Sequence, residues 1–229
     1  KENKDLTREM QRYAKSRVAA LADEGLSGYV LKKDSPSCGM ERVRVYQGEG
    51  RPPKRNGRGL FAEVLLDRFP NLPVEEEGRL HDPPLRENWV TRVFAYHRLR
   101  ELWGRRWGIG DLVRFHTAHK FLLLAHSPKD YSELGRVVAD AKSLTRTALR
   151  ATYETQFMSA LSKRASRAKN TNVLQHILGF FKKDLDGRRV AYLGTSGRAE
   201  FIGEFILPKN VRPRRVLGPA VGFYFHLAF

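Results

Sequence analysis

The residues best suited to chemistry lie in one short stretch, Asp34-Ser-Pro-Ser-Cys-Gly39, which carries the single cysteine of the 229-residue chain. Its side-chain oxygens and free backbone N–H groups crowd around one thiol. A thiolate is both a nucleophile and a ligand for soft metal ions, so Cys38 is a candidate for either role. The alternative is a small buried hydrophobic residue, which is the commoner role of a single cysteine.

The elements around this turn predict an α/β domain. Tyr29-Val-Leu31 is an apolar run of strand-forming residues directly before the turn. A helical pattern over 5–23 precedes it. A short helix is expected over 60–69, and a further strand over 72–77. Ligands bind at the carboxyl ends of strands in open α/β sheets, which is where Cys38 would lie. We therefore expect a truncated α/β domain with a Rossmann-like parallel sheet over residues 1–103.

From Pro84 the pattern becomes helical for most of the remaining chain. The glycines, charges and broken period of 104–110 mark the expected domain boundary. Further helices are expected over 112–125, with Asp111 as its N-cap, and over 130–140, 143–162 and 171–184. The sequence thus predicts a mostly α-helical domain over 104–189. The basic tail 190–229 shows no clear period and stays unassigned.

The chain is strongly basic, with 42 Lys and Arg against 25 Asp and Glu and a net charge of +17. The excess is concentrated after residue 100, where 22 basic side chains face 10 acidic ones. A basic excess of this size predicts a polyanionic partner, and we favour nucleic acid over a merely soluble basic protein. No apolar run approaches the ~20 residues of a membrane helix. With one cysteine no internal disulfide can form, and the reducing cytoplasm is the expected compartment.

Several polar and basic residues are candidates for RNA contact. The Gly- and Pro-rich stretch 47–59 is either a basic arm beside the Cys38 turn or a solvated linker. It lacks the Lys-Ser/Thr ending of a P-loop, which excludes a nucleoside triphosphate site of that type. The candidates in this stretch are Arg51, Lys54, Arg55 and Arg58, and those in the helical domain are His119, Lys120, His126, Asn172, Gln175 and His176.

Two other clusters allow a metal as one of two interpretations. His116 and His119 have the i, i+3 spacing of a zinc-binding pair, but no third ligand is evident, so packed or hydrogen-bonded histidines are the preferred interpretation. The three adjacent carboxylates of Glu75-Glu-Glu77 could hold a cation. More commonly such residues cap a helix or balance nearby arginines.

Three stretches resemble the thiouracil desulfidase family: Gly28-Tyr-Val-Leu-Lys-Lys-Asp-Ser-Pro-Ser-Cys-Gly39, Gly57-Arg-Gly-Leu-Phe61 and Leu72-Pro-Val-Glu-Glu-Glu-Gly-Arg-Leu80. Later stretches resemble the helical domain often fused behind it: Phe115-His-Thr-Ala-His-Lys-Phe121, Leu124-Ala-His-Ser-Pro128, Tyr131 and Asn172-Val-Leu-Gln-His176. The fused pair is similar to bacterial enzymes that remove sulfur from 4-thiouridine in tRNA. The resemblance covers about residues 5–187.

The resemblance implies an iron–sulfur enzyme that replaces sulfur by oxygen without net redox change. A 4Fe-4S cluster held by three cysteines leaves one iron open, and Cys38 would be one of the three ligands. Ser35 or Ser37 would hydrogen-bond the base or relay a proton, and the basic helical domain would hold the tRNA. The other two cysteines are expected upstream, so this chain alone should be inactive. Two alternatives remain open: a desulfidase of free thiolated nucleobases and a non-catalytic basic RNA-binding module.

Overall fold

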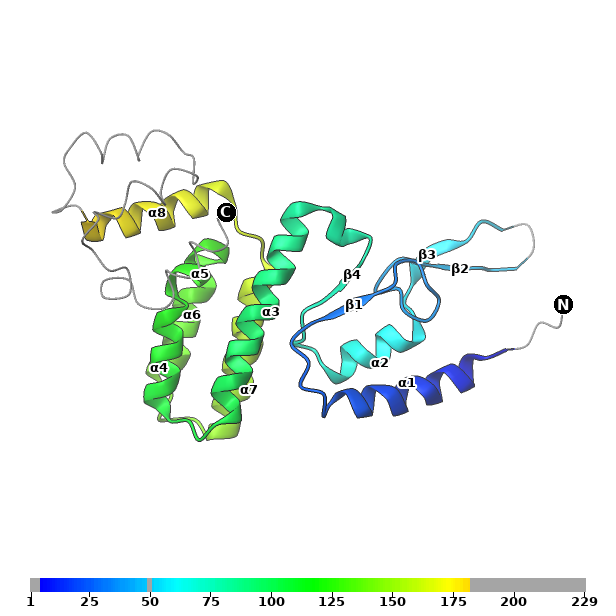
Figure 1. Ribbon diagram of the computed structural model, residues 1–229, viewed down its shortest axis with the longest axis horizontal. Coiled ribbons are helices and arrows are strands. Elements are labelled where there is room, and N and C mark those ends of the chain that lie inside the picture. Colours follow the sequence, from blue (N-terminus) through cyan, green and yellow to red (C-terminus); the bar gives the residue numbers. More distant parts are fainter. Residues whose placement is uncertain (1–4, 49–50, 182–229) are drawn as a thin grey trace. The chain divides into compact units, whose positions relative to one another are not determined.

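The structure is a computed structural model that describes residues 5–48 and 51–181 (Figure 1). The chain divides into two compact units, Lys1–Arg100 and Glu101–Phe229. The division falls inside the long helix α3 (Pro83–Gly104). The expected basic tail, 190–229, lies outside the described residues.

The first unit is built on two parallel strands. It contains α1 (Thr7–Leu21), β1 (Tyr29–Leu31), β2 (Val43–Val45), β3 (Lys54–Gly57), α2 (Leu60–Arg68), β4 (Val74–Glu76) and the short 3-10 helix η1 (Arg79–His81). Strands β1 and β4 pair in parallel, with Tyr29 opposite Val74 and Leu31 opposite Glu76. Parallel neighbours need a crossover connection, which here runs through α2. The predicted α/β beginning of the chain is confirmed.

The core of this unit lies between the helices and the sheet. Figure 1 shows α1 and α2 side by side on one side of β1 and β4. The two helices bury Ala14, Val18, Phe61 and Leu65. Leu31 on β1 is buried as well, so the strand that leads into Cys38 is anchored by apolar packing.

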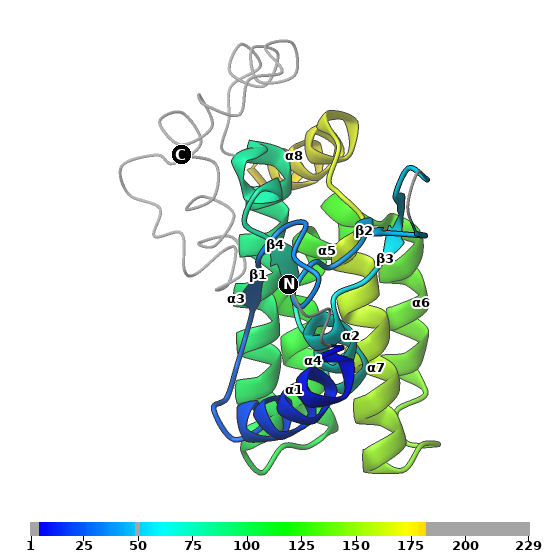
Figure 2. The same ribbon diagram turned by 90° about the vertical axis from the view of Figure 1, so that its right-hand side faces the viewer.

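The second unit is helical, which confirms the predicted change of class. After the end of α3 it contains α4 (Ile109–Ala118), α5 (Lys120–His126), α6 (Pro128–Ala139), α7 (Arg146–Ser162) and α8 (Arg167–Phe181). Figure 2 shows α6 and α7 side by side. Their buried side chains include Leu134, Tyr153 and Phe157. No helix within 5–48 or 51–181 has the length and apolar character needed to cross a membrane.

Two local predictions are wrong. The helix predicted over 112–125 begins at Ile109 and breaks at His119 into α4 and α5. Asp111 is the third residue of α4, where its carboxylate accepts a hydrogen bond from the N–H of Gly108 at 2.8 Å. The Gly- and Pro-rich stretch 47–59, in which no strand was expected, contains β3, which pairs antiparallel with β2. Strand β3 is almost wholly exposed, so its sequence carries no apolar alternation.

Candidate functional site

Cys38 lies in the loop that follows β1, residues 32–40, which we name the Cys38 loop. The thiol is half-buried and is hydrogen-bonded to the Ser37 hydroxyl, with 3.3 Å between Oγ and Sγ. Ser35 Oγ lies 2.9 Å from Ser37 Oγ and accepts the N–H groups of Ser37 and Cys38, each at 3.3 Å. Because Ser35 Oγ already accepts two hydrogen bonds, its hydroxyl is best oriented to donate a hydrogen bond to Ser37 Oγ. Ser37 then donates to the sulfur, an arrangement that suits a thiolate.

The loop is docked on the beginning of α2. The N–H of Gly59 donates to Gly39 O at 2.8 Å, and the N–H of Phe61 donates to Ser37 O at 2.8 Å. These N–H groups have no partner inside the helix, so the loop carbonyls satisfy them where no side chain caps α2. A Cβ at Gly59 would lie 2.4 Å from Ser37 O and 2.6 Å from Cys38 N. Only glycine allows this close approach.

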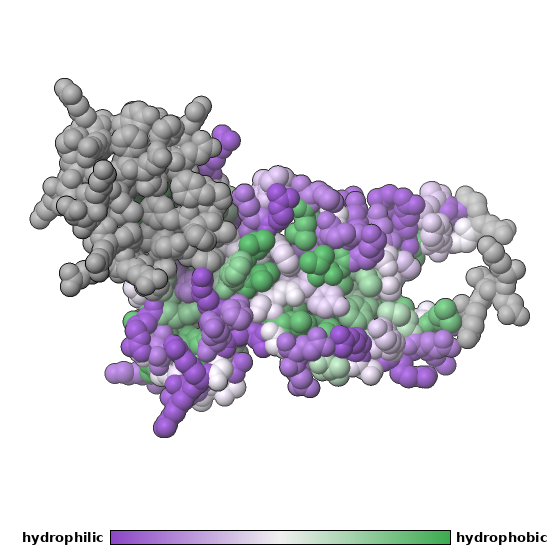
Figure 3. Space-filling view, viewed as in Figure 1, coloured by the Kyte–Doolittle hydropathy of each residue, from purple (hydrophilic) through white to green (hydrophobic). Residues whose placement is uncertain are grey.

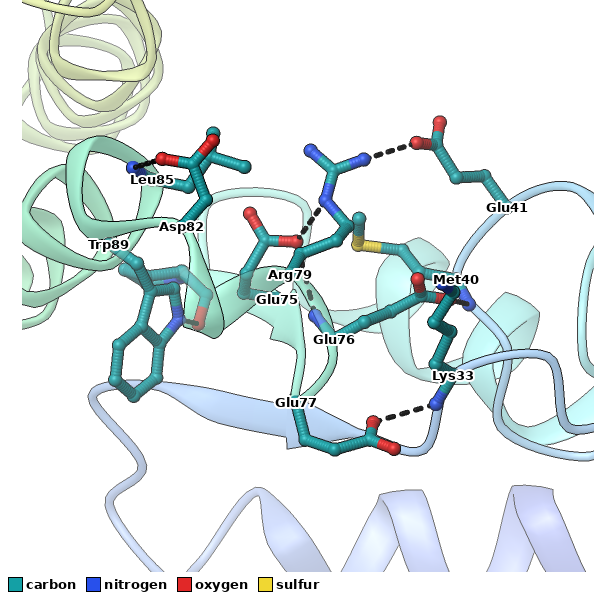
Figure 4. A network of polar contacts seen from close by, with 11 residues as sticks. Lys33, Met40, Glu41, Glu75, Glu76, Glu77, Arg79, Asp82, Leu85 and Trp89 are labelled. Atoms are coloured by element: carbon teal, nitrogen blue, oxygen red, sulfur yellow. Dashed lines mark hydrogen bonds and ion pairs between the residues drawn. The ribbon is translucent and has the colours of Figure 1, made fainter.

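Glu76, the last residue of strand β4, and Glu77, which directly follows it, hold the two ends of the same loop, and we name these two carboxylates the β4 clamp (Figure 4). Glu76 Oε1 accepts the N–H of Met40 at 2.8 Å, and Glu77 Oε2 accepts the N–H of Lys33 at 2.7 Å. Glu76 is only 3% exposed. A hydrogen bond from the Lys32 ammonium lowers the pKa of Glu77 below its ordinary value. The clamp fixes where the Cys38 loop begins and ends.

The third carboxylate of this run, Glu75, is balanced by an arginine. Glu75 Oε1 lies 2.7 Å from Arg79 Nε and accepts the N–H of Glu76 at 3.1 Å. Arg79 also pairs with Glu41, as Figure 4 shows. Among the residues that the structure describes, no group of three or more His, Cys, Asp or Glu side chains is placed to hold a metal ion. The ion pair with Arg79 supports the interpretation of Glu75 as the partner of a nearby arginine.

The β2–β3 hairpin and its neighbouring residues form a basic arm, described over 41–48 and 51–58, which follows the Cys38 loop along the chain. Arg51, Lys54 and Arg55 are exposed on it, and Figure 3 shows hydrophilic side chains over this region. Arg58 is also exposed, and its Nε donates to Met40 O at 3.2 Å. The arm and the thiol-bearing loop are thus joined by a direct hydrogen bond.

The candidates of the helical unit fall into two groups. His119 and His126 are buried, with Nδ1 atoms 2.8 Å from Phe115 O and 2.6 Å from Lys163 O. These contacts confirm the interpretation of packed, hydrogen-bonded histidines, so we assign both side chains to the packing of this unit and not to its surface. The remaining candidates are at least partly exposed: Lys120, Asn172, Gln175 and His176.

His116 is buried between aromatic rings. Its Nδ1 lies 3.2 Å from the Tyr153 hydroxyl, and its ring stacks on Tyr131 with centroids 5.2 Å apart. Within the described residues its Nε2 has no hydrogen-bond partner. Burial lowers the pKa of His116, because the charged form would lose its hydration.

Sequence reasoning missed the residues that position the Cys38 loop. Gly59, Glu76 and Glu77 act through contacts with residues far along the chain, and no local pattern predicts such contacts. The usable signal was topological. If β1 and β4 are parallel neighbours, side chains at the end of β4 must lie beside the loop that follows β1.

Two family models match the chain. Residues 1–77 match that of the 2-thiouracil desulfurases, and residues 120–196 match one described as a protein of unknown function (DUF1722). The uncharacterized protein YbgA of Escherichia coli (strain K12) is 32% identical over 101 residues, which are 44% of this chain and 60% of that protein. The chain thus aligns with less than two thirds of that relative. No solved structure matches. The desulfurase match confirms the expected resemblance over residues 1–77.

Proposed function

We propose that the full-length protein removes sulfur from 4-thiouridine in tRNA and replaces it with oxygen. The observation that carries this proposal is the position of Cys38. Its half-buried thiol lies beyond the carboxyl end of a parallel strand, on a loop held at both ends, inside the stretch that matches the 2-thiouracil desulfurases. Such an end of a strand is where α/β proteins bind ligands.

Cys38 fits one ligand position of a 4Fe-4S cluster. It offers a soft sulfur ligand, and the Ser37 hydroxyl 3.3 Å away would hydrogen-bond the thiolate. A cluster of this kind needs three such ligands when one iron is left open, and the chain has one cysteine. In the proposal the other two ligands are cysteines that this sequence does not contain. When bound, the cluster would supply an open iron that polarises the thiocarbonyl group as a Lewis acid.

The reaction exchanges two atoms without an oxidant or a reductant. A water oxygen forms a bond to the base carbon, and the bond from that carbon to sulfur breaks. Sulfur leaves as hydrosulfide with one of the two water protons, and the other proton is released. Two distances support a proton-carrying role for Ser35 and Ser37: their hydroxyl oxygens lie 2.9 Å apart, and Ser37 Oγ lies 3.3 Å from the Cys38 sulfur. We assign to them the transfer of a proton from the attacking water toward the departing sulfur.

The basic arm would hold the RNA beside this loop. Arg51, Lys54 and Arg55 are exposed and suited to phosphate, and Arg58 is joined to Met40 at the end of the Cys38 loop. A phosphate group bound by the arm would therefore bring its nucleotide close to Cys38. In the helical unit, four exposed or partly exposed side chains would add contacts to the same RNA: Lys120, Asn172, Gln175 and His176.

A second candidate is a desulfidase of free thiolated nucleobases. The description of the matching family names 2-thiouracil, which is a free base. In this case turnover would not depend on the basic arm, because a small neutral base offers no phosphate to it. The basic charge would then serve another purpose.

The test uses the full-length protein reconstituted with iron and sulfide without oxygen. Wild-type protein should bind iron and release hydrosulfide from thiolated tRNA, and Cys38→Ala should abolish both. Full iron content in Cys38→Ala would contradict the assigned ligand. Release of hydrosulfide from free 2-thiouracil but not from tRNA would select the second candidate. Binding of tRNA without any iron-dependent turnover would select a non-catalytic RNA-binding module.

A further inference from the structure

The helical unit carries a second basic surface, where the end of α3 meets the beginning of α7. The Arg146 guanidinium carbon lies 5.4 Å from the Trp107 ring centroid, and that of Arg150 lies 5.9 Å from the Trp103 ring centroid. The two indole rings are adjacent, with centroids 4.7 Å apart. Both tryptophans are buried and both arginines are exposed. Two solvent-facing guanidinium groups are thus seated on a buried pair of indoles.

More positive charge surrounds this pair. Arg105 and Arg106, directly before Trp107, are exposed. Arg105 lies 3.7 Å from Asp111, whose carboxylate is also bound by Arg114 at 2.6 Å. Residues 141–170 contain seven basic side chains and one acidic side chain. We name the set Trp103, Arg105, Arg106, Trp107, Arg146 and Arg150 the indole–arginine surface.

The placement of the two α7 arginines is unfavourable for the protein on its own. Arg146 is the first residue of α7, where the helix dipole disfavours a cation, and the first turn of α7 contains no acidic residue. Arg150 follows at i+4, so the two like charges share one helix face and repel each other. A bound anion would relieve both effects, which is a physical reason to expect one here.

We propose that the indole–arginine surface binds the phosphate backbone of RNA. A guanidinium group donates two parallel hydrogen bonds to a phosphate, and its seat on an indole reduces the side-chain freedom lost on binding. The indoles are covered, so they offer no face on which a base could stack. Binding is therefore through the backbone and carries no base specificity. Only the identity of the RNA as tRNA rests on the proposed function.

The main experiment compares two double variants of the full chain with the same loss of charge. Arg146→Gln with Arg150→Gln should make the negative slope of log affinity against log salt less steep for unmodified bulk tRNA. The expected change is about 2, roughly one for each phosphate that is no longer bound. The control, Lys129→Gln with Arg136→Gln on exposed positions of α6, should leave the slope near that of the wild type. Equal losses in the two variants would overturn the proposal. Binding of polyglutamate as tight as that of tRNA would also overturn it, in favour of an acidic polypeptide partner.

A second measurement reports on the surface directly. The chain has three tryptophans, so Trp89→Phe leaves Trp103 and Trp107 as its reporters. Addition of tRNA should change their fluorescence, and the change should disappear when Arg146 and Arg150 are glutamine. An unchanged spectrum at saturating tRNA would contradict the proposal. Neither measurement needs iron or a thiolated base, so failure of the desulfidase proposal would leave both results interpretable.

Discussion

Glu76 and Met40 are joined by a hydrogen bond of 2.8 Å from the backbone N–H of Met40 to the carboxylate of Glu76 (Figure 4). The residues are 36 positions apart, and the bond links strand β4 to the end of the Cys38 loop. Because Glu76 is only 3% exposed, water cannot easily replace the carboxylate as an acceptor. The position of the Cys38 loop therefore depends on a buried side chain of the neighbouring strand.

Loss of this carboxylate should loosen the loop. Glu76→Ala leaves the Met40 N–H without its acceptor and should lower the free energy of unfolding of the first unit by about 1–3 kcal/mol. Glu76→Gln retains an acceptor oxygen and should cost less. Urea unfolding measures the stability, and hydrogen exchange of the Met40 amide reports on the bond itself. The control is Glu87→Ala, at an exposed position of α3. Unchanged protection of the Met40 amide in Glu76→Ala would show that the clamp does not hold this end.

Substitution by alanine should change the stability in opposite directions at two glycines. Gly59 lies where α2 closely approaches the Cys38 loop, and Gly135 lies in open space on α6. Gly59→Ala would bring a Cβ to 2.4 Å from Ser37 O, a backbone atom that can move only with the loop. We expect a loss of about 1–3 kcal/mol in the free energy of unfolding of the first unit. Gly135→Ala on α6 has nothing within 4 Å and should stabilise the helical unit by about 0.5–1 kcal/mol. Thermal and urea unfolding measure both, and a neutral Gly59→Ala would contradict the close packing of α2 against the loop.

The sequence predicted the elements in which burial of one face leaves a recognisable pattern of apolar residues. Strand β1 could be recognised because Tyr29-Val-Leu31 is apolar and is followed by turn residues. The break between α4 and α5 could not be recognised, because His119 lies inside a continuous apolar pattern. Its imidazole hydrogen-bonds Phe115 O in the preceding turn, a contact that no sequence pattern indicates. Strand β3 was missed because it packs on no core, and its pairing with β2 depends on backbone groups that every residue shares.

The candidate site was predicted in its chemistry but not in its support. Cys38, Ser35 and Ser37 could be identified because they are adjacent in the sequence and their side chains have evident chemistry. The indole–arginine surface was not predicted, since it joins residues about 40 positions apart on separate helices. A periodic pattern indicates which face of a helix is buried, but not which other helix covers it.

The buried imidazole of His116 should make the helical unit sensitive to acid. Burial lowers the pKa of this group below its ordinary value of 6.5, so the folded state keeps the neutral form where the unfolded chain takes up a proton. Its contribution to stability is therefore complete above pH 6.5 and is lost as the pH falls toward the folded-state pKa. His116→Gln should weaken the dependence of the urea midpoint on pH between about 7.5 and 5, measured by helical circular dichroism. His176→Gln, at an exposed position of α8, should not change it. Parallel pH profiles for wild type and His116→Gln would contradict this assignment.

The basic arm should dominate the binding of RNA by the first unit. Neutralising Arg51, Lys54 and Arg55 together should make the negative slope of log affinity against log salt less steep by about 2–3. Each phosphate that the arm no longer neutralises retains about one condensed counterion, which is then not released on binding. Arg58 stays unchanged, since its bond to Met40 O makes it part of the loop structure.

The matched control removes three charges from the exposed face of α1, at Arg8, Arg12 and Lys15. Filter binding or fluorescence anisotropy with bulk tRNA across a salt series measures both variants. If phosphates lie along the arm, the slope falls in the arm variant and not in the α1 variant. Equal slopes for the two variants would mean that net charge alone attracts RNA to this unit. The arm would then have no special part in bringing a nucleotide to Cys38, and the free-base desulfidase would be the better account of the site.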